Sequence, residues 1–235
     1  MLQAAAVDGE RLERMLARRV LGEPLEQVLG WAEFSGQRIV VAPGVFVPRR
    51  RTEFLVERAA QLLGADTRPV VVDLCCGTGA IGVAIAERLD VELHAADVDP
   101  DAVACARQNV TMGEVHEGNL YDALPVGLRG RVDLLAVNAP YVPTDEIRLM
   151  PPEARLHEHH VALDGGSDGL DLQRRVASGA PEWLRPGGTL LIETSQAQVE
   201  ATAAACADAG LRPTTLSRDE STLVEAVAPS VSSRT

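Results

Sequence analysis

The tetrapeptide Asn138-Ala139-Pro140-Tyr141 contains the residue types that point most directly to chemistry. A planar nitrogen, in an amide or an aromatic amine, is a poor nucleophile because its lone pair is delocalised. The side-chain oxygen of Asn138 and the carbonyl of Ala139 can hold its hydrogens, while Pro140 stiffens the turn and the Tyr141 ring covers the planar group. The turn predicts a site that aligns a planar nitrogen with an electrophilic carbon and needs no general base. A plain strand-to-loop turn is the alternative.

A glycine-rich loop forms a second candidate site, in the segment Asp73-Leu-Cys-Cys-Gly-Thr-Gly-Ala-Ile-Gly82. Gly77, Gly79 and Gly82 fit the dinucleotide-binding pattern G-x-G-x-x-G. Asp97 follows Gly77 by 20 residues, where its carboxylate can accept hydrogen bonds from ribose hydroxyls. NAD and S-adenosylmethionine both fit this pattern, and glycines that only allow a helix to pack closely on a strand remain an alternative.

The charge of Asp73 distinguishes between these two ligands. A dinucleotide places its pyrophosphate at the N-terminus of the helix, where a nearby carboxylate is unfavourable. S-adenosylmethionine has no phosphate and carries an ammonium and a sulfonium group, so a carboxylate suits it, by direct contact or by holding the loop backbone. We therefore expect S-adenosyl-L-methionine as the cofactor and S-adenosyl-L-homocysteine as the product. A nicotinamide oxidoreductase is the less favoured alternative.

An alternation of strands and helices after residue 52 places both segments in one sheet. Unbroken apolar runs such as 70–72 and 134–137 are typical of parallel strands covered on both faces. We predict strands at residues 70–74, 92–96, 114–117, 132–137, 189–193, 213–216 and 222–227, and helices at 52–63, 79–88, 100–109, 169–184 and 196–209. The fold class is α/β, with a seven-stranded, mainly parallel, doubly wound sheet of Rossmann-like type and an antiparallel edge. Ligands bind such sheets at the carboxyl ends of the strands, where both segments lie.

The N-terminal segment, residues 1–50, is predicted to form a short helix and a β-hairpin. Residues 8–21 carry the apolar face of an amphipathic helix, formed by Leu12, Met15, Leu16 and Val20. Runs at 38–41 and 45–47, separated by proline and glycine, predict the hairpin. We assign residues 51–229 to the S-adenosylmethionine-dependent domain and 230–235 to a disordered tail.

Charge and composition limit the classes of partner. The chain carries 34 acidic and 22 basic side chains, which gives a formal net charge of −12. This charge opposes binding to phosphate backbones and anionic membranes, so nucleic acid is a disfavoured substrate. The sequence has no run of 18 apolar residues, and charged side chains interrupt its first twenty positions. We therefore expect no spanning helix, no signal peptide and a cytoplasmic location.

Taken together, these motifs resemble those of a known family. The Asp-x-x-x-Gly-x-Gly loop, Asp97 and the Asn-x-Pro-Tyr turn are similar to those of class I S-adenosylmethionine-dependent methyltransferases. Within that class they resemble the HemK-type protein-glutamine N5-methyltransferases, which modify bacterial peptide release factors. The likeness runs from about residue 22 to residue 227. Further stretches support it: Glu23-Pro24-Leu25 with Gly30, Pro48-Arg49 with Thr52-Glu53, Ala162-Leu163 with residues 165–170, and Leu184-x-Pro-Gly-Gly188 through Glu193.

The resemblance implies a place for each part of the reaction. The methyl donor is expected to bind largely through backbone groups of the loop, with Asp97 on the ribose and Asn119 beside the adenine. The implied donor-binding residues are Asp73, Cys75, Cys76, Gly77, Thr78, Gly79, Asp97, Asn119, Leu120 and Asn138, and the implied catalytic residues are Asn138, Ala139, Pro140 and Tyr141. The implied partner is a protein substrate with an exposed glutamine, such as a peptide release factor.

The chain departs from the family pattern at several points. Ala139 stands where the family usually has proline, which keeps the carbonyl acceptor and predicts a looser loop. Asn119 replaces an aspartate, so a hydrogen bond to the adenine amine remains without the charge. Arg50 and Arg51 reverse the local charge beside the site. Only 22 residues precede Glu23, where the family usually carries a substrate-binding helical domain, so we expect a paralogue with a shortened N-terminal domain.

Two further functions remain open at this point. The same turn suits planar amines in general, so N-methylation of an exocyclic amine in RNA or DNA is one alternative. A catalytically silent paralogue that keeps the cofactor for a regulatory role is the other. The oligomeric state is not predicted.

Two groups of reactive side chains are expected to lack a catalytic or metal-binding role. The four cysteines do not have the spacing of a zinc site and are expected to pack as reduced thiols. His157, His159 and His160 lie in a segment predicted to be an exposed loop over the site, without a ligand partner at helical spacing. We therefore expect no metal ion.

Overall fold

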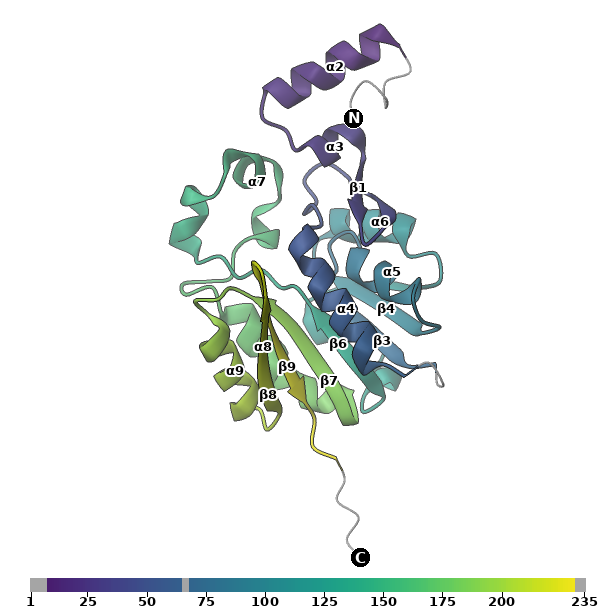
Figure 1. Ribbon diagram of the computed structural model, residues 1–235, viewed down its shortest axis with the longest axis vertical. Helices are drawn as coiled ribbons and strands as arrows, with labels where there is room; N and C mark the ends of the chain where they lie inside the picture. Colours follow the sequence, from purple (N-terminus) through teal and green to yellow (C-terminus); the bar gives the residue numbers. More distant parts are fainter. Residues whose placement is uncertain (1–7, 65–67, 231–235) are drawn as a thin grey trace, which may run out of the picture.

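A seven-stranded sheet forms the centre of the molecule (Figure 1). The computed structural model describes residues 8–64 and 68–230, and the strand order within them is β5-β4-β3-β6-β7-β9-β8. The strands are β3 (Val70–Leu74), β4 (Glu92–Asp97), β5 (Gly113–Glu117), β6 (Val132–Val137), β7 (Leu184–Thr194), β8 (Arg212–Arg218) and β9 (Ser221–Val227). The first five strands in this order run parallel, and β9 is antiparallel to both of its neighbours. The predicted α/β fold and its antiparallel edge are confirmed.

Helices cover both faces of this sheet (Figure 1). One face carries α4 (Glu53–Leu62), α5 (Ala80–Ala86) and α6 (Pro100–Asn109), and the other carries α8 (Asp171–Trp183) and α9 (Val199–Asp208). Val71 belongs to the same buried cluster as Leu55 of α4, whereas its neighbour Val72 belongs to the cluster that contains Val176 of α8. Successive residues of a strand point to opposite faces, so an unbroken apolar strand fills both cores.

The order in which strands are added to the sheet reverses between β3 and β6. After β3 the chain adds β4 and β5 on one side, whereas β6 and β7 lie on the other side. The register pairs Leu74 with Val137 at the carboxyl ends of β3 and β6. The loop after β3 and the turn after β6 therefore leave the sheet side by side, at the switch point where open α/β sheets bind ligands.

The N-terminal hairpin differs from the predicted one. It consists of β1 (Trp31–Phe34) and β2 (Gln37–Val40), joined by Ser35 and Gly36, whose φ angles are +53° and +77°. Positive φ angles at both central residues are typical of two-residue hairpin turns. The predicted strand at 45–47 is wrong, because the proline and glycine before it end β2 without reversing the chain into a paired strand.

Most other predicted elements are confirmed, and their ends differ where local sequence says little. β6 and α6 have the predicted bounds, whereas β7 begins at Leu184 rather than at residue 189, since Leu184 pairs with Val132. Two short helices, α3 (Leu25–Leu29) and α7 (Pro152–His157), were not predicted. Helices of five or six residues contain too few turns to show helical periodicity.

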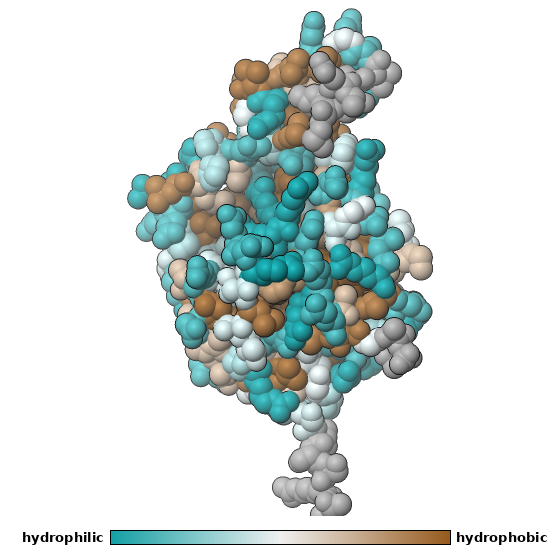
Figure 2. Space-filling view, in the orientation of Figure 1, coloured by the Kyte–Doolittle hydropathy of each residue, from teal (hydrophilic) through white to brown (hydrophobic). Residues whose placement is uncertain are grey.

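The N-terminal helix α2 (Gly9–Val20) stands at one end of the molecule (Figure 1). Asp8 caps it, because its Oδ1 accepts a hydrogen bond from the Arg11 N–H at 2.7 Å. Of the predicted apolar face only Met15 is buried, whereas Val20 is 86% exposed, and hydrophobic surface is visible at this end (Figure 2). Among the helices of the described residues, none has the length and apolar character needed to cross a bilayer. The expected tail at 230–235 lies, apart from Ser230, outside the described residues.

Candidate active site

The loop between β3 and α5 packs closely against the end of β4. Its backbone turns through three residues with positive φ, which are Cys75 at +60°, Gly77 at +56° and Gly79 at +77°. The Cys76 N–H donates a hydrogen bond to the Ala96 carbonyl at 3.0 Å. A Cβ atom at Gly79 would lie 2.9 Å from the nearest side-chain atom, so glycine is needed there for both conformation and space. The loop therefore offers mainly backbone groups to a ligand.

Asp97, at the end of β4, fixes this loop and can still bind a ligand. Its Oδ2 accepts a hydrogen bond from the Gly77 N–H at 2.8 Å, and its Oδ1 accepts one from the Asp99 N–H at 3.0 Å. Burial raises the pKa of Asp97, and these backbone hydrogen bonds oppose the rise. A carboxylate oxygen can accept more than one hydrogen bond, so both oxygens remain able to accept from a hydroxyl.

Asp73 lies beneath the loop. The side chain is fully buried in β3, and its Oδ2 accepts a hydrogen bond from the Gly82 N–H at 2.8 Å. Its Oδ1 has no hydrogen-bond partner among the described residues, and burial raises the pKa of Asp73 to about 7. Of the two roles expected for Asp73, this position fits support of the loop backbone and not direct contact with a ligand.

The turn after β6 orients Asn138 through its side-chain NH2 group. Asn138 Nδ2 donates a hydrogen bond to Thr52 Oγ1 at 3.4 Å, and Thr52 is buried at the start of α4. Burial raises the pKa of Glu193 in β7, and the Thr52 hydroxyl opposes that rise as a hydrogen-bond donor. Because an NH2 group can only donate, the Thr52 oxygen is the acceptor of this hydrogen bond. No donor in the described parts of the chain contacts Asn138 Oδ1, which is left free to accept from a ligand.

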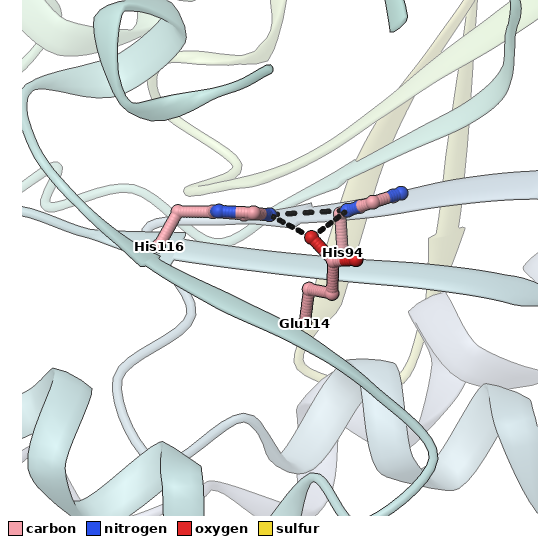
Figure 3. A group of neighbouring side chains, drawn as sticks. All are labelled: His94, Glu114 and His116. Carbon is pink, nitrogen blue, oxygen red and sulfur yellow. Dashed lines mark hydrogen bonds and ion pairs between the residues drawn. The ribbon is translucent and has the colours of Figure 1, made fainter.

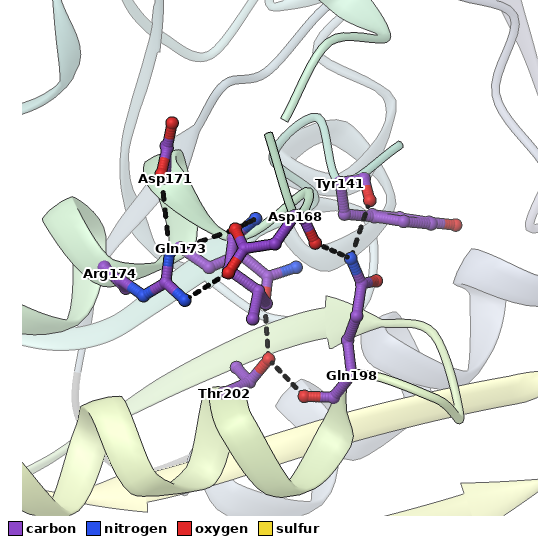
Figure 4. A network of polar contacts seen from close by, with 8 residues as sticks. Tyr141, Asp168, Asp171, Gln173, Arg174, Gln198 and Thr202 are labelled. Carbon is purple, nitrogen blue, oxygen red and sulfur yellow. Dashed lines mark hydrogen bonds and ion pairs between the residues drawn. The ribbon is translucent and has the colours of Figure 1, made fainter. Parts of the chain in front are cut away.

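The other end of the turn is held at Tyr141 (Figure 4). Its carbonyl accepts a hydrogen bond from Gln198 Nε2 at 2.9 Å, and Gln198 Nε2 also donates to the Asp168 carbonyl at 3.0 Å. The Tyr141 hydroxyl accepts from Arg51 Nη2 at 2.7 Å. Burial raises the pKa of Tyr141, so the hydroxyl stays protonated at neutral pH and does not act as a base. The turn is fixed at both ends even with Ala139 in place of a proline.

A cavity of about 380 Å³ lies between the loop and the turn. This volume falls in the range of roughly 300 to 1,000 Å³ that is typical of small-molecule sites. The cavity brings together all predicted site residues except Asp73 and Gly79, which do not line it. Those that line it are Cys75, Cys76, Gly77, Thr78, Asp97, Asn119, Leu120, Asn138, Ala139, Pro140 and Tyr141.

Several residues that close the cavity were not predicted from the sequence. Arg175 Nη2 donates a hydrogen bond to Asn119 Oδ1 at 2.9 Å, and this oxygen keeps a lone pair for a ligand. These residues could not be recognised from a local sequence pattern, because they reach the cavity from elements that are far apart in the chain. Pro48, Thr52 and Leu163 were the exceptions, since all three lie in stretches that carry the family resemblance. The additional lining residues include Phe46, Pro48, Thr52, Val161, Leu163 and Arg175.

The segment with the three histidines is packed more closely than the predicted exposed loop, although the side chain of His160 is 65% exposed. It continues from α7, and Glu158 within it is buried, with Oε1 accepting a hydrogen bond from Arg49 Nη2 at 2.6 Å. His159 Nδ1 lies 2.6 Å from Asp99 Oδ2. These contacts hold the N-terminal segment and the end of β4 together over the cavity.

The two loop thiols have the environment of packing groups. Burial raises the pKa of Cys75 and of Cys76 well above the usual range for a thiol. Both thiols therefore stay protonated at neutral pH, whereas a nucleophilic cysteine needs a lowered pKa.

Known proteins share this fold. Residues 36–154 match the family described as "Methyltransferase small domain". A methyltransferase from Pyrococcus furiosus is 14% identical, with a TM-score of 0.61 over 93% of this chain and 100% of that chain. The T. Thermophilus 16S rRNA N2 G1207 methyltransferase is 18% identical, with a TM-score of 0.60 over 84% of this chain and 49% of that chain. At such identities the likeness shows the fold alone.

Curated relatives are closer in sequence. A release factor glutamine methyltransferase of Geobacter sulfurreducens is 40% identical over 191 residues, which cover 79% of this chain and 66% of the relative. A protein of the same name in Streptomyces coelicolor is 39% identical over 80% of this chain and 68% of its own length. A 4-amino-L-phenylalanine/4-methylamino-L-phenylalanine methyltransferase of Streptomyces pristinaespiralis is 36% identical over 80% of this chain and 67% of its own length. The chain thus spans about two thirds of the length of these relatives.

The sheet, the loop with Asp97 and the turn at Asn138 define a class I S-adenosylmethionine-dependent methyltransferase. The sequence identities to the curated relatives also define the family within this class. The chain belongs to the HemK-type protein-glutamine N5-methyltransferase family.

The residues of the cavity fit the cofactor of this class. Asp97 offers free acceptor positions for ribose hydroxyls, and Leu120 offers an apolar surface for a base. Asp97, which lines the cavity, places a carboxyl group where the anionic pyrophosphate of a dinucleotide would be unfavourable and a cationic ligand is not. The donor set thus suits S-adenosylmethionine.

Proposed function

We propose that the protein transfers the methyl group of S-adenosylmethionine to the N5 nitrogen of a glutamine side chain in a protein substrate. The free side-chain oxygen of Asn138 is the observation that carries this proposal. Because Thr52 engages the NH2 group of Asn138, that oxygen is fixed as an acceptor at the cavity. A fixed acceptor beside a backbone carbonyl suits a primary amide, whose nitrogen has two hydrogens to hold.

The turn acts by holding the substrate amide in line with the donor. Asn138 Oδ1 and the Ala139 carbonyl each accept one hydrogen of the amide, and the Tyr141 ring covers its plane. S-adenosylmethionine supplies an electrophilic methyl group on a positively charged sulfur. The amide nitrogen forms a bond to that methyl carbon as the carbon–sulfur bond breaks and the sulfur keeps the electron pair. A proton then leaves the methylated nitrogen for water, so alignment provides most of the catalysis.

The opposite half of the cavity binds the donor in this proposal. Asp97 accepts hydrogen bonds from the ribose hydroxyls, and Asn119 Oδ1 accepts one from the adenine amine. Leu120 packs on the base, and backbone groups of the glycine loop bind the amino-acid end. Asp73 supports that loop from below through Gly82.

Replacing Thr52 by valine is expected to slow methyl transfer about 3- to 10-fold, the loss expected for one hydrogen bond. Valine has the shape of threonine but offers Asn138 no acceptor, so the amide loses its fixed orientation. Turnover with a glutamine substrate should fall, while calorimetry should give an unchanged affinity for S-adenosylhomocysteine. Thr214→Val, at an exposed position of β8, is the matched control. Turnover equal to that of the unmodified protein would contradict the orienting role of Thr52.

A small aromatic amine is the second candidate substrate, because one relative, 36% identical to this chain, is named for 4-amino-L-phenylalanine. The test offers the protein labelled S-adenosylmethionine with a peptide release factor, with total RNA and with 4-amino-L-phenylalanine. We expect one labelled glutamine in the release factor, located by mass spectrometry, and no label when that glutamine is changed to asparagine. Label only in the amino acid would favour the second candidate, and label only in RNA would contradict both. Donor binding with transfer to none of them would indicate a silent paralogue.

A further inference from the structure

Two histidines and a glutamate meet at the edge of the sheet, away from the cavity (Figure 3). The parallel pairing of β4 with β5 places His94 opposite Glu114, and His116 lies two residues further along β5. His94 Nδ1 lies 3.0 Å from His116 Nε2, and Glu114 Oε2 lies 3.8 Å and 3.7 Å from these two nitrogens. Three possible ligand atoms therefore face one another on one side of the sheet.

We propose that His94 Nδ1, His116 Nε2 and Glu114 Oε2 bind one divalent metal ion of the zinc type. Zinc bonds of about 2.0 to 2.2 Å in tetrahedral geometry place neighbouring ligand atoms roughly 3.4 Å apart. The three separations lie between 3.0 and 3.8 Å, close to that spacing. The ring centroids lie 5.3 Å apart, so the two nitrogens point at one another and each ring must also rotate toward the ion. Two imidazoles and one carboxylate are a donor set that zinc accepts, with a fourth position left for water.

The other nitrogen of His94 has the partner that a metal-binding histidine needs. His94 Nε2 lies 3.4 Å from Glu92 Oε1, and Arg131 Nη2 donates to Glu92 Oε2 at 3.4 Å. A carboxylate on the far nitrogen fixes the proton there and leaves the near nitrogen, Nδ1, with its lone pair free for a metal. The cluster therefore includes both the ligands and the group that orients one of them.

A hydrogen bond between two neutral imidazoles accounts for the short contact between the rings but not for Glu114. In the described parts of the chain this carboxylate contacts only the two histidines within ion-pair distance and no arginine. Its side chain is 68% exposed, whereas the side chains of His94 and His116 are 7% and 16% exposed. An ion can approach from solvent on the Glu114 side, where it reaches the two largely buried histidine side chains.

The second cluster of this kind has a different explanation. His159 faces Asp99 with Nδ1 at 2.6 Å and faces Asp101 with Nε2 at 3.9 Å. The two carboxylates lie at opposite nitrogens of the ring. Their oxygens and a single ring nitrogen therefore do not converge on one ion position as the ligand atoms of the first cluster do. The short contact between His159 and Asp99 across the cavity rim accounts for this cluster, which serves as the control.

A metal at the first cluster would join the edge strand β5 to β4. β5 ends at Glu117 and leads directly to Asn119, on the wall of the cavity. Binding of an ion only to the folded state stabilises that state by mass action. We therefore assign the site a structural role, fixing the strand that leads to Asn119.

Calorimetry with zinc tests the site, using the full chain without a histidine tag after removal of metals by a chelator. We expect one ion per chain, a higher melting temperature with zinc, and absorption of a tetrahedral complex when cobalt replaces zinc. Glu114→Gln and His116→Gln should each weaken binding at least about 10-fold and abolish the thermal shift, because each removes a ligand. Asp101→Asn, in the control cluster, should bind zinc as the unmodified protein does.

The outcome decides between the two clusters. Metal-free melting curves first establish that each variant is folded. If His116→Gln does not fold, Glu114→Gln still tests the site, because the Glu114 side chain is exposed. Absence of stoichiometric binding to the unmodified protein would overturn the proposal. Unchanged affinity in Glu114→Gln, or loss of binding in Asp101→Asn instead, would do the same.

Discussion

Asn138→Ala is expected to reduce turnover about 10²- to 10³-fold, the loss typical of one hydrogen bond that stabilises a transition state in a preorganised site. The variant loses the acceptor that Thr52 orients toward the cavity. A methylation assay with a glutamine substrate measures the effect as a fall in kcat. The affinity for S-adenosylhomocysteine should change less than the rate, because the proposed contact is to the substrate amide.

The reverse result would remove Asn138 from the mechanism. A turnover within a factor of two of the unmodified rate, with a substrate methylated at glutamine, would show that the amide is held by other groups. Equal losses of turnover and of donor affinity would instead show that Asn138 mainly shapes the donor site. The Thr52→Val variant separates these cases, since it leaves the Asn138 side chain present but unfixed.

Asp97→Ala is expected to weaken donor binding by about 1.5 to 3 kcal/mol, since hydrogen bonds to a charged group are worth that much. This corresponds to an increase in Kd of roughly 10- to 150-fold. The change removes the proposed acceptor for the ribose and also the anchor of the Gly77 N–H at 2.8 Å. Titration calorimetry with S-adenosylhomocysteine measures it directly.

Two further variants separate the two parts of the Asp97 effect. Asp97→Asn keeps one oxygen for the Gly77 N–H and loses the charge, so we expect an intermediate loss of affinity. Asp101→Ala, at an exposed position of the next helix, is the matched control and should leave the affinity unchanged. An unaltered Kd in Asp97→Ala would contradict both the ribose contact and the anchoring role.

The sheet could be predicted from sequence because its signal is local. The strand at 132–137 is an unbroken apolar run, and α6 begins with Asp99 as its cap and Pro100 in its first turn, so their bounds follow from neighbouring residues. The hairpin was misplaced for the same reason. Pro43-Gly44 is the stronger turn signal in sequence, yet the chain reverses at Ser35-Gly36, where only the backbone conformation reveals it.

The candidate site was predictable where one segment carries the whole feature. The glycine loop, Asp97 and the turn at 138–141 are local motifs at strand ends, and the structure brings them to one cavity. Thr52 and Gln198 were not predicted as supports of the turn, because their roles depend on contacts with residues 86 and 57 positions away in the chain. The position of Asp73 beneath the loop follows from the pleat of β3, which sequence spacing does not resolve.

The substitution of Ala139 has a smaller structural consequence than the sequence suggests. Ala139 is buried and belongs to the core cluster beneath the turn. Asn138, just before it, is held by Thr52, and Tyr141, two residues after it, is held by Gln198. Contacts from outside the turn therefore hold it on both sides of Ala139.

A crystal structure with bound S-adenosylmethionine tests the central claim most directly, because it shows how the donor lies relative to the turn. The account predicts the ribose hydroxyls on Asp97, the adenine beside Asn119 and Leu120, and the methyl group on the side of the cavity that Asn138 Oδ1 faces. A donor whose ribose is remote from Asp97, or whose sulfur is turned away from Asn138 beyond the reach of any side-chain rotation, would contradict it.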